Sequence, residues 1–576
     1  MATKSWAPPP IREYGLLGDT RTAALTSLSG SIDWMCWPRF DSPPTFGRLV
    51  DPAHGGFFEI SVIGAAPAAR RYRDRSAVLE TTWKASGIEA TLIETMAMRR
   101  TGSVLVRRLT CVRGQVTGRL LYDPRPGMPG TSSRQAKVVL RTHPELQVQP
   151  GRPTEFELLS GESLTTVLSD RDETVAARRA TKLIDNTDEW WRKWSDEIKS
   201  GKRYRDVLVR SLINLRLLTY TPTGAPVAAP TTSLPEEIGG SRNWDYRLSW
   251  PRDASVGVAA FLAVGKYKEA REFVKWLVSR ACTGHDPIRV LYDLDGMAAK
   301  PERQVGGVAG YMNSRPVRVG NLAGEQHQLD VYGWVVDALW NLVEADRKLS
   351  ANGRRALASY ADWVASHWRQ ADSGLWEVRD TPTHYVHSKV WAWIALDRAT
   401  RTAEALQMNR RRTAAWERER DLVAADIRQH GFSSTLGSYV RSYGSTEMDS
   451  ALLLLPLTGF DNDPQRLAGT VDAIWKQLGA GGPLVHRYPP GRDGLPGKEG
   501  AFLPCSFWLL EALLRLGRVD EGMRIFEQTL NLIGELLLLP EEIDPATGAF
   551  LGNYPLALSQ AGLVHAVLEV QKALDA

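Results

Sequence analysis

Two acidic loops in the second half of the sequence carry the residue types needed to cleave a bond to oxygen. Glu377 follows Trp376 in a glycine-bearing loop, and the pair Glu541 and Glu542 ends an apolar run. One carboxylic acid can protonate a poor leaving oxygen while a second carboxylate takes a proton from water, and an inverting glycosidase holds the two groups roughly 6.5–9.5 Å apart. Trp376 could supply the apolar surroundings that raise the pKa of the acid. Taken singly, a loop glutamate is more often a surface group, and an acidic pair often caps a helix.

An aromatic segment in front of a predicted helix offers groups that recognise a sugar. Residues 239–253 read GGSRNWDYRLSWPRD. The two tryptophans and Tyr246 could stack on the C–H faces of a pyranose. Arg252 offers a fork of donors, and Asp253 offers a pair of acceptors, for adjacent hydroxyl groups. The alternative interpretation is an ion pair with aromatic neighbours that closes one end of the fold.

The N-terminal part of the chain, from Tyr14 to about Leu168, has the pattern of a β-sandwich. Short runs alternate or carry β-branched residues, and Gly, Pro, Asp and Ser separate them. The runs expected as strands are 23–28, 31–36, 57–62, 78–83, 90–96, 104–112 and 137–142. Repeated short strands favour an antiparallel sandwich. The following stretch, from about Asp172 to Ser200, is charged with an apolar stripe and predicts a connecting helix.

Beyond Tyr204 the apolar period becomes helical. The expected helices are 207–218, 255–264, 268–281, 328–348, 354–368, 386–400, 402–429, 448–457, 464–478, 505–517, 519–533 and 556–574. Twelve helices in up-down order can close as six hairpins into an (α/α)6 barrel, whose loops at one end form a pocket. A helical solenoid is the rival architecture, but the sequence shows no fixed-period repeat. The expected fold is multidomain, with α and β parts: an N-terminal antiparallel β-sandwich, a linker helix and a C-terminal (α/α)6 barrel.

Composition argues for a folded protein without a nucleic-acid or membrane partner. The 576 residues are 43% hydrophobic and 24% charged, and the formal charge of +5 comes without a dense Lys/Arg run that would follow a phosphate backbone. No segment reaches the roughly 18 apolar residues of a membrane span, and residues 1–20 lack the apolar core of a signal peptide, so we expect a cytoplasmic protein. The chain also lacks the phosphate-binding, dinucleotide-binding, serine-hydrolase and HExxH zinc motifs. Its isolated cysteines predict buried thiols rather than disulfides or a metal site: Cys36, Cys111, Cys282 and Cys505.

Taken in order along the chain, these clusters resemble glycoside hydrolase family 15, the group of glucoamylases, glucodextranases and prokaryotic trehalases. The likeness covers nearly the whole sequence. It is carried by YGLLGD at 14–19, GSIDW at 30–34 and PRFDSP at 38–43 in the N-terminal part, and by RNWDYR at 242–247 with the Trp, Arg and Asp of 250–253 in the second part.

The resemblance implies a catalytic barrel whose acid is Glu377 and whose base is Glu541 rather than Glu542. In the family the acid ends a Leu-Trp-Glu motif and the base opens a Glu-x-x-Asp motif, with Asp544 as the matching Asp. The implied substrate-binding residues are Tyr246, Trp250, Arg252, Asp253, Trp376, Arg487 and Trp508. The implied domains are 1–171 for the sandwich, 172–203 for the linker and 204–576 for the barrel. This mechanism needs neither a metal nor an organic cofactor.

The reaction expected from the resemblance is exo-acting hydrolysis of an α-glucoside with inversion, which releases β-glucose from the non-reducing end. Because no signal peptide is evident, trehalose or a small α-gluco-oligosaccharide is favoured as the substrate. The alternatives are a glucoamylase or glucodextranase acting on longer α-glucans, a catalytically impaired carbohydrate-binding protein, and a phosphorolytic barrel enzyme. The chain departs from many relatives at Leu556 and Gln560, which replace Gln and His, and at Pro251, which stands where Leu is frequent. These changes spare both carboxylates but could alter the pocket rim or the support of the base.

Overall fold

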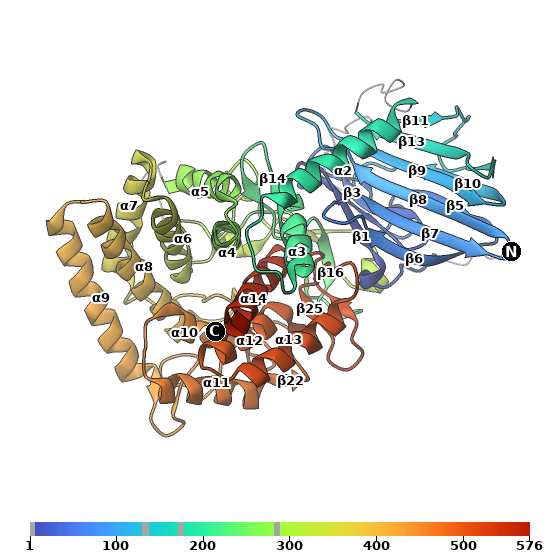
Figure 1. Ribbon diagram of the computed structural model, residues 1–576. Coiled ribbons are helices and arrows are strands. Elements are labelled where there is room, and N and C mark those ends of the chain that lie inside the picture. The colour runs from blue at the N-terminus through green and yellow to red at the C-terminus, as the bar shows by residue number, and fades with distance from the viewer. Residues whose placement is uncertain (1–5, 129–137, 171–177, 282–287, 576) are drawn as a thin grey trace.

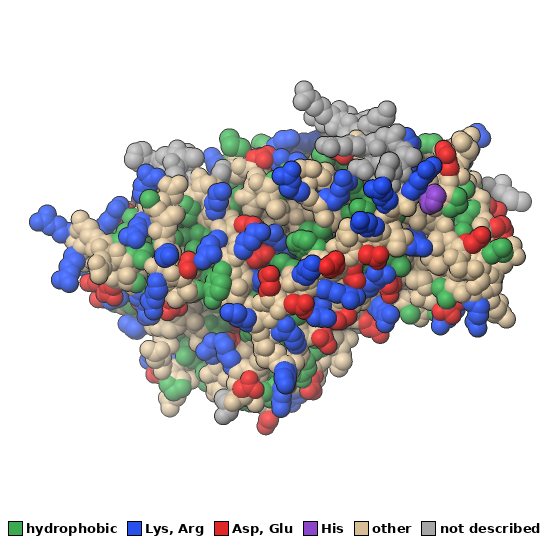
Figure 2. Space-filling model, turned by 45° about the horizontal axis from the view of Figure 1, so that its top comes forward, with side chains coloured by type: hydrophobic (Ala, Val, Ile, Leu, Met, Phe, Trp, Pro, Cys, Tyr) green, Lys and Arg blue, Asp and Glu red, His purple; other side chains and the backbone are tan. Residues whose placement is uncertain are grey.

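In the computed structural model, an antiparallel β-sandwich lies against one side of a barrel of helices (Figure 1). The structure describes residues 6–128, 138–170, 178–281 and 288–575. On the face shown in Figure 2, basic and acidic side chains are interspersed over the surface. None of the described helices is both long and apolar enough to cross a membrane.

Two antiparallel sheets make up the sandwich. One has the strand order β1-β2-β3-β5-β10-β12 with β4 paired to β3, and the other has the order β11-β13-β9-β8-β7-β6. The strands are β1 (Gly15–Gly18), β2 (Ala23–Thr26), β3 (Ser31–Cys36), β4 (Pro44–Phe46), β5 (Phe57–Val62), β6 (Ala66–Tyr72), β7 (Leu79–Ala85), β8 (Ile88–Met96), β9 (Val104–Arg113), β10 (Gln115–Asp123), β11 (Val139–His143), β12 (Pro153–Leu159) and β13 (Ser163–Ser169).

The strands follow from alternation, because one face of each sheet packs into the core between them. In β5, Phe58, Ile60 and Val62 are buried while the residues between them are partly exposed. The runs predicted at 31–36 and 57–62 have the bounds of β3 and β5. No predicted run covers β1, β4, β6, β10, β12 or β13. Of these, β10 follows β9 after the single residue Gly114, and the edge strand β12 is mostly solvent-exposed. The run predicted at 137–142 corresponds to β11, and its first residue lies outside the described residues.

A buried ion pair joins the two sheets of the sandwich. Arg107 on β9 and Glu94 on β8 are both 0% exposed, and the Arg107 Nε and Glu94 Oε1 atoms are 2.9 Å apart. Arg107 Nη1 also donates to the carbonyl oxygen of Phe58 at 2.7 Å, and Glu94 Oε1 accepts from the Thr26 hydroxyl at 3.1 Å. Phe58 and Thr26 belong to the opposite sheet, so these charge-assisted hydrogen bonds fix the sheets to each other through the core.

Helix α2 (Ala180–Asp196) connects the sandwich to the barrel and runs along the sandwich in Figure 1. It buries Ile184, Trp191 and Trp194 on one face, as its apolar stripe predicts. Trp194 Nε1 donates to Glu269 Oε1 of the barrel at 2.7 Å. The predicted helix start at 172 and the predicted boundary at 171 lie within 171–177, outside the described residues.

The barrel consists of an inner and an outer ring of helices. The inner helices are α4 (Pro251–Ala263), α6 (Asp330–Asp346), α8 (Val386–Ala405), α10 (Leu455–Thr458) with the preceding 3-10 turn η4 (Ser450–Leu454), α12 (Leu503–Arg515) and α14 (Ala557–Asp575). The outer helices are α3 (Arg205–Leu217), α5 (Tyr267–Ala281), α7 (Ala351–His367), α9 (Arg410–His430), α11 (Pro464–Leu478) and α13 (Val519–Ile533). Consecutive inner helices contact one another, and α14 contacts α4, which closes the ring.

The sequence distinguishes the two rings by their apolar patterns. Helix α12 is buried from Leu503 to Leu514 on all sides, whereas α13 buries one face that includes Ile525 and Phe526. Each predicted helix has its counterpart, and α11 and α13 have the predicted bounds. The break predicted between 400 and 402 was wrong: α8 continues to Ala405, and α9 begins at Arg410 because the Asn409 side chain caps it.

Short two- and three-stranded pieces hold the loops that lead into the inner helices. They are β14 (Thr219–Tyr220), β15 (Ala225–Pro226), β16 (Thr232–Pro235), β17 (Asn243–Asp245), β18 (Arg303–Val305), β19 (Val317–Val319), β20 (Phe432–Ser433), β21 (Ser438–Tyr439), β22 (Gly479–Gly481), β23 (Leu484–Val485), β24 (Ala501–Phe502), β25 (Glu542–Ile543) and β26 (Phe550–Leu551). Strand β17 leads to α4, β24 to α12 and β26 to α14, so these loops meet where the inner helices begin. Cys36, Cys111 and Cys505 are free and buried, as predicted, and Cys282 lies outside the described residues.

Candidate active site

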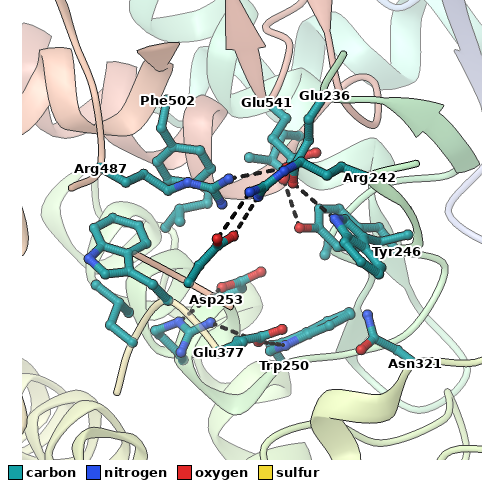
Figure 3. Close-up of a pocket in the computed structure, with 18 of the residues that line it drawn as sticks. Glu236, Arg242, Tyr246, Trp250, Asp253, Asn321, Glu377, Arg487, Phe502 and Glu541 are labelled. Atoms are coloured by element: carbon teal, nitrogen blue, oxygen red, sulfur yellow. Dashed lines mark hydrogen bonds and ion pairs between the residues drawn. The ribbon is translucent and has the colours of Figure 1, made fainter. Parts of the chain in front are cut away.

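A pocket lies among the loops that precede the inner helices (Figure 3). It brings together the substrate-binding and catalytic residues predicted from the sequence: Tyr246, Trp250, Arg252, Asp253, Trp376, Glu377, Arg487, Trp508 and Glu541. These residues come from four regions of the chain that are distant in sequence. The remaining lining residues are Ala228, Glu236, Arg242, Trp244, Asn321, Trp334, Leu375, Arg379, Tyr488, Asp493, Leu495, Phe502, Leu556 and Leu558.

The aromatic segment before α4 contacts both predicted catalytic carboxylates. The Tyr246 hydroxyl donates to Glu541 Oε1 at 2.7 Å, and Trp250 Nε1 donates to Glu377 Oε1 at 2.8 Å. The two rings meet edge to face with their centroids 5.4 Å apart. One rigid aromatic pair therefore holds two carboxyl groups on the walls of one pocket (Figure 3).

This segment is fixed from both sides. Arg247 forms a bidentate pair with Asp245, in which Nε and Nη2 each donate to one carboxylate oxygen at 2.8 Å. Its Nη1 donates to the carbonyl oxygen of Ser42 in the sandwich at 3.1 Å. Pro251 occupies the first turn of α4, where its missing N–H costs no helical hydrogen bond. A second contact with the sandwich lies near the pocket, where the Tyr554 hydroxyl donates to the carbonyl oxygen of Tyr14 at 2.9 Å. The sandwich therefore helps to position Tyr246.

Glu377 sits in a tight loop ahead of α8. Its backbone has a φ of 59°, in the left-handed region that ordinary residues rarely adopt, and its side chain is 23% exposed. Besides Trp250, Arg252 Nη2 contacts Glu377 Oε1 at 3.4 Å. From the sequence, Trp376 was expected to surround this carboxyl. Trp376 lines the pocket together with Glu377; its ring packs against Trp508, and its Nε1 donates to Asp449 Oδ1 at 2.7 Å.

Glu541 and Glu542 have different surroundings, since Glu541 lies in a bend and Glu542 begins strand β25. Glu541 is 0% exposed, lines the pocket, and accepts a second hydrogen bond from the backbone N–H of Asn553 to Oε2 at 3.0 Å. Glu542 accepts from the backbone N–H of Gly500 at 2.7 Å and is not among the residues that line the pocket. Asp544 caps a turn, where it accepts from Ala546 N and the Thr547 hydroxyl, and it too is absent from the pocket lining.

Arg252 and Asp253 stand together in the first turn of α4. Arg252 Nη1 donates to Gln328 Oε1 at 3.1 Å, and the guanidinium lies 3.8 Å from the carboxylates of both Asp253 and Asp330. Burial raises the pKa of Asp253 to about 6, against the attraction of Arg252. These contacts hold a donor fork and an acceptor side by side, as a site for adjacent hydroxyl groups requires.

Arg487 has a role that the sequence did not indicate. It lines the pocket, but its Nη2 forms ion pairs with Glu499 at 2.8 Å, Glu542 at 2.9 Å and Glu236 at 3.3 Å. Burial and the neighbouring Glu236 raise the pKa of Glu541 to about 8, while Arg487 lowers it. Glu236 was not predicted from the sequence, because the pair Glu236 and Glu237 matches no catalytic motif. Glu236 nevertheless lies only three residues before the aromatic segment at 239–253.

Comparison with known proteins places the chain in a family. The family description "Glycosyl hydrolases family 15" matches residues 202–568, and "Trehalase-like, N-terminal" matches residues 4–178. The chain belongs to glycosyl hydrolase family 15.

Similar proteins cover nearly the whole of this glycoside hydrolase. It is 34% identical to a trehalase of Mycobacterium tuberculosis over 632 residues, which covers 100% of this chain and 92% of that protein. It is 32% identical to a trehalase of Thermoplasma volcanium, with 98% of this chain and 94% of that protein covered. A bacterial glucoamylase solved in complex with acarbose has the same fold, with a TM-score of 0.74, 14% identity, and 99% of this chain and 95% of that chain covered. The sandwich and the (α/α)6 barrel expected from the sequence are thereby confirmed.

The departures from the family pattern have different places in the structure. Leu556 lines the pocket, so the replacement of a Gln there makes part of the wall apolar. Gln560 is fully buried on α14, where it accepts from the Ser211 hydroxyl at 2.8 Å and donates to the Leu537 carbonyl at 3.1 Å. It therefore ties α14 to its neighbours.

One group of acids among the described residues has the spacing of a cation site. Glu236, Glu499 and Glu542 each offer an oxygen within 4.8 Å of the others. Arg487 already forms an ion pair with each of the three, so its guanidinium supplies the positive charge that the group requires.

Proposed function

We propose that this glycoside hydrolase cleaves trehalose with inversion at one anomeric carbon, with Glu377 as the general acid and Glu541 as the general base. One observation carries the proposal. Two carboxyl groups of one pocket are each held by a ring of the same aromatic segment, Glu541 by Tyr246 and Glu377 by Trp250. Such preorganisation is what paired acid and base catalysis requires.

The contacts of each carboxyl group fit its proposed role. Glu541 receives hydrogen bonds on both oxygens, from Tyr246 and from the backbone of Asn553, which fix the carboxylate where it can take a proton from water. A raised pKa, about 8, makes it a stronger base once it is ionised. Glu377 is partly open to the pocket, so its proton can reach a leaving oxygen.

Trehalose as the substrate is supported by the relatives. Those described as trehalases share about a third of their residues with this chain over its full length. Arg252 and Asp253 would bind hydroxyl groups of the terminal glucose, while Trp250 and Trp508 offer ring faces to it. Binding of a terminal glucose by these residues would direct attack to the end of a substrate.

The chemical step balances without a further reactant. Glu377 gives its proton to the glycosidic oxygen as the bond from that oxygen to C1 breaks. Water adds its hydroxyl group to C1 from the opposite face and loses a proton to Glu541. From α,α-trehalose the attacked glucose leaves as the β-anomer and the released partner as the α-anomer.

A proton NMR time course of the anomeric signals tests this proposal. With trehalose we expect equal initial amounts of α- and β-glucose before mutarotation, and slower release from maltose and isomaltose. Only α-glucose at early times would contradict inversion. Glucose 1-phosphate formed in phosphate buffer would contradict hydrolysis, and preferential release from maltose or isomaltose would replace trehalose with an α-gluco-oligosaccharide as the substrate.

Substitution of each carboxyl group tests the assigned roles. Glu377→Gln and Glu541→Gln should each lower turnover by orders of magnitude while circular dichroism stays unchanged. Glu511→Gln is the matched control, since it alters a buried acid of the barrel that does not line the pocket. Full activity in Glu541→Gln would disprove the assignment of the base.

A further inference from the structure

Four glutamates surround Arg487 in a buried charge network that forms part of the pocket wall. Arg487 contacts the carboxylates of Glu499, Glu542 and Glu236, whose oxygens lie within 4.8 Å of one another. Glu541 directly precedes Glu542 in the chain, and it lines the pocket together with Glu236. All five side chains are buried.

The charges of this network do not balance. Arg242 is the second cation near the network. Its Nη1 makes its shortest ion pair, 2.5 Å, with Asp493, so Asp493 is counted with the network as a fifth carboxyl group. Two guanidinium groups therefore face five carboxyl groups. Ionising all of the carboxyls in a buried site would be strongly unfavourable, so some of them must hold protons. Which of them ionises decides whether Glu541 can act as a base.

We propose that Glu236 is a positioning residue that, together with Arg487, controls whether Glu541 carries the negative charge that activates water. The proposal rests on the assignment of Glu541 as the base. Glu236 Oε1 is held by a hydrogen bond from Trp244 Nε1 at 3.0 Å. Its Oε2 accepts no hydrogen bond from the described residues but faces two guanidinium groups, Arg487 Nη2 at 3.3 Å and Arg242 Nη1 at 3.5 Å. Burial disfavours the charged form of this carboxyl group, whereas the two guanidinium groups favour it, so the charge on Glu236 depends on their balance.

The ionisable groups that face Glu541 act in opposite directions. Glu236 comes from the end of β16, Tyr246 from the segment after β17, Arg487 from the loop after β23, and Glu542 from β25. After burial, repulsion by Glu236 is the main influence that raises the pKa of Glu541, and Arg487 and the Tyr246 hydroxyl lower it. A protonated Glu236 removes this repulsion, so that Glu541 ionises at a lower pH. The charge state of Glu236 thus sets the pH at which its neighbour becomes a base.

The test is the pH dependence of kcat/KM for trehalose in full-length Glu236→Gln and Arg487→Gln. In Glu236→Gln, the low-pH limb of the kcat/KM profile should move to lower pH by roughly one unit. This shift is a tenfold gain in kcat/KM at a given pH on that limb. In Arg487→Gln, the low-pH limb should move to higher pH by a similar amount. Glu511→Gln is the matched control: Glu511 is a buried acid on α12 whose pKa is also raised to about 8, but it does not line the pocket. Its limb should stay in place.

The two shifts have opposite signs, which separates this proposal from a structural role. If Glu236→Gln lowers activity equally at every pH and leaves the limb in place, the proposal is overturned. If Arg487→Gln fails to fold, Arg487→Lys replaces it; this variant keeps the charge and should keep the limb near its original pH while Glu236→Gln still shifts it. Glu541→Gln is measured in parallel. Full activity in that variant refutes the assigned base itself, whereas its inactivity combined with an unmoved limb in Glu236→Gln refutes only the role of Glu236.

Discussion

Substituting alanine for Gly552 should displace the side chain of the base, Glu541, although no catalytic residue is itself replaced. Gly552 has a φ of 71°, and a Cβ placed there would lie 2.3 Å from Glu541 Oε2 and 2.6 Å from Glu541 Cβ. Its backbone N–H is bound to the Pro235 carbonyl oxygen at 2.8 Å, which prevents the loop from simply moving away. The Glu541 side chain therefore has to yield.

The size of the effect follows from the overlap. An ordinary contact begins near 3.4 Å, so the carboxylate must retreat by about 1 Å, and a misplacement of that size can cost on the order of 100-fold in rate. The left-handed backbone adds a strain of roughly 1–2 kcal/mol to the cost in stability. Gly548 separates these two effects, because its φ is 72° and a Cβ added there would meet nothing within 4 Å.

The assay compares kcat for trehalose and the Tm of Gly552→Ala and Gly548→Ala. We expect a similar strain contribution in both, a fall in kcat of roughly 100-fold in Gly552→Ala, and nearly unchanged kcat in Gly548→Ala. Equal kcat values for the two variants would refute the reasoning, since backbone strain alone would then explain everything observed. A normal kcat in Gly552→Ala would also show that the position of Glu541 does not limit the reaction.

Two further predictions concern stability. Arg107→Leu leaves Glu94 buried without its ion-pair partner and should lower the free energy of unfolding by about 3–5 kcal/mol. Urea unfolding followed by circular dichroism measures this loss. A loss below about 1 kcal/mol would contradict a tightly coupled pair. Burial raises the pKa of Glu511 to about 8, above its value of roughly 4.3 in the unfolded chain, so folding takes up a proton between these pH values and stability falls as the pH rises through that window. Glu511→Gln should therefore raise Tm more at pH 8 than at pH 4 in scanning calorimetry, and an equal change at both would contradict the shift.

The parts of the site that were predictable are those that stand in order along the chain. The aromatic segment that holds Tyr246 and the motifs around Glu377 and Glu541 keep their order and residue types, and the structure brings them to one pocket. The helical period of the barrel was equally readable, because inner and outer helices differ in how much of their surface is apolar. Strand β12 was missed because an exposed edge strand has little apolar alternation to reveal it.

What the sequence could not predict depends on contacts between distant loops. The structure places Glu236 beside Glu541, although they are separated by some 300 residues, and no local pattern encodes that proximity. Arg487 was predicted to bind sugar, but its three carboxylate partners come from three other segments. Trp376 and Glu377 line one pocket, but the partner of the Trp376 indole N–H, Asp449, lies some 70 residues further along the chain and could not be predicted.

The contacts of Arg247 with Ser42 and of Tyr554 with Tyr14 bear on how this enzyme can be recombined. Both bonds end on backbone carbonyl oxygens of the sandwich, so they depend on the path of its chain rather than on particular side chains there. A chimera that joins this barrel to the sandwich of a relative would keep the hydrogen-bond acceptors only if that path is preserved to within a few tenths of an ångström. Any single crossover between Ser42 and Arg247 divides both pairs, so it has to join two chains whose backbones follow the same path at this interface.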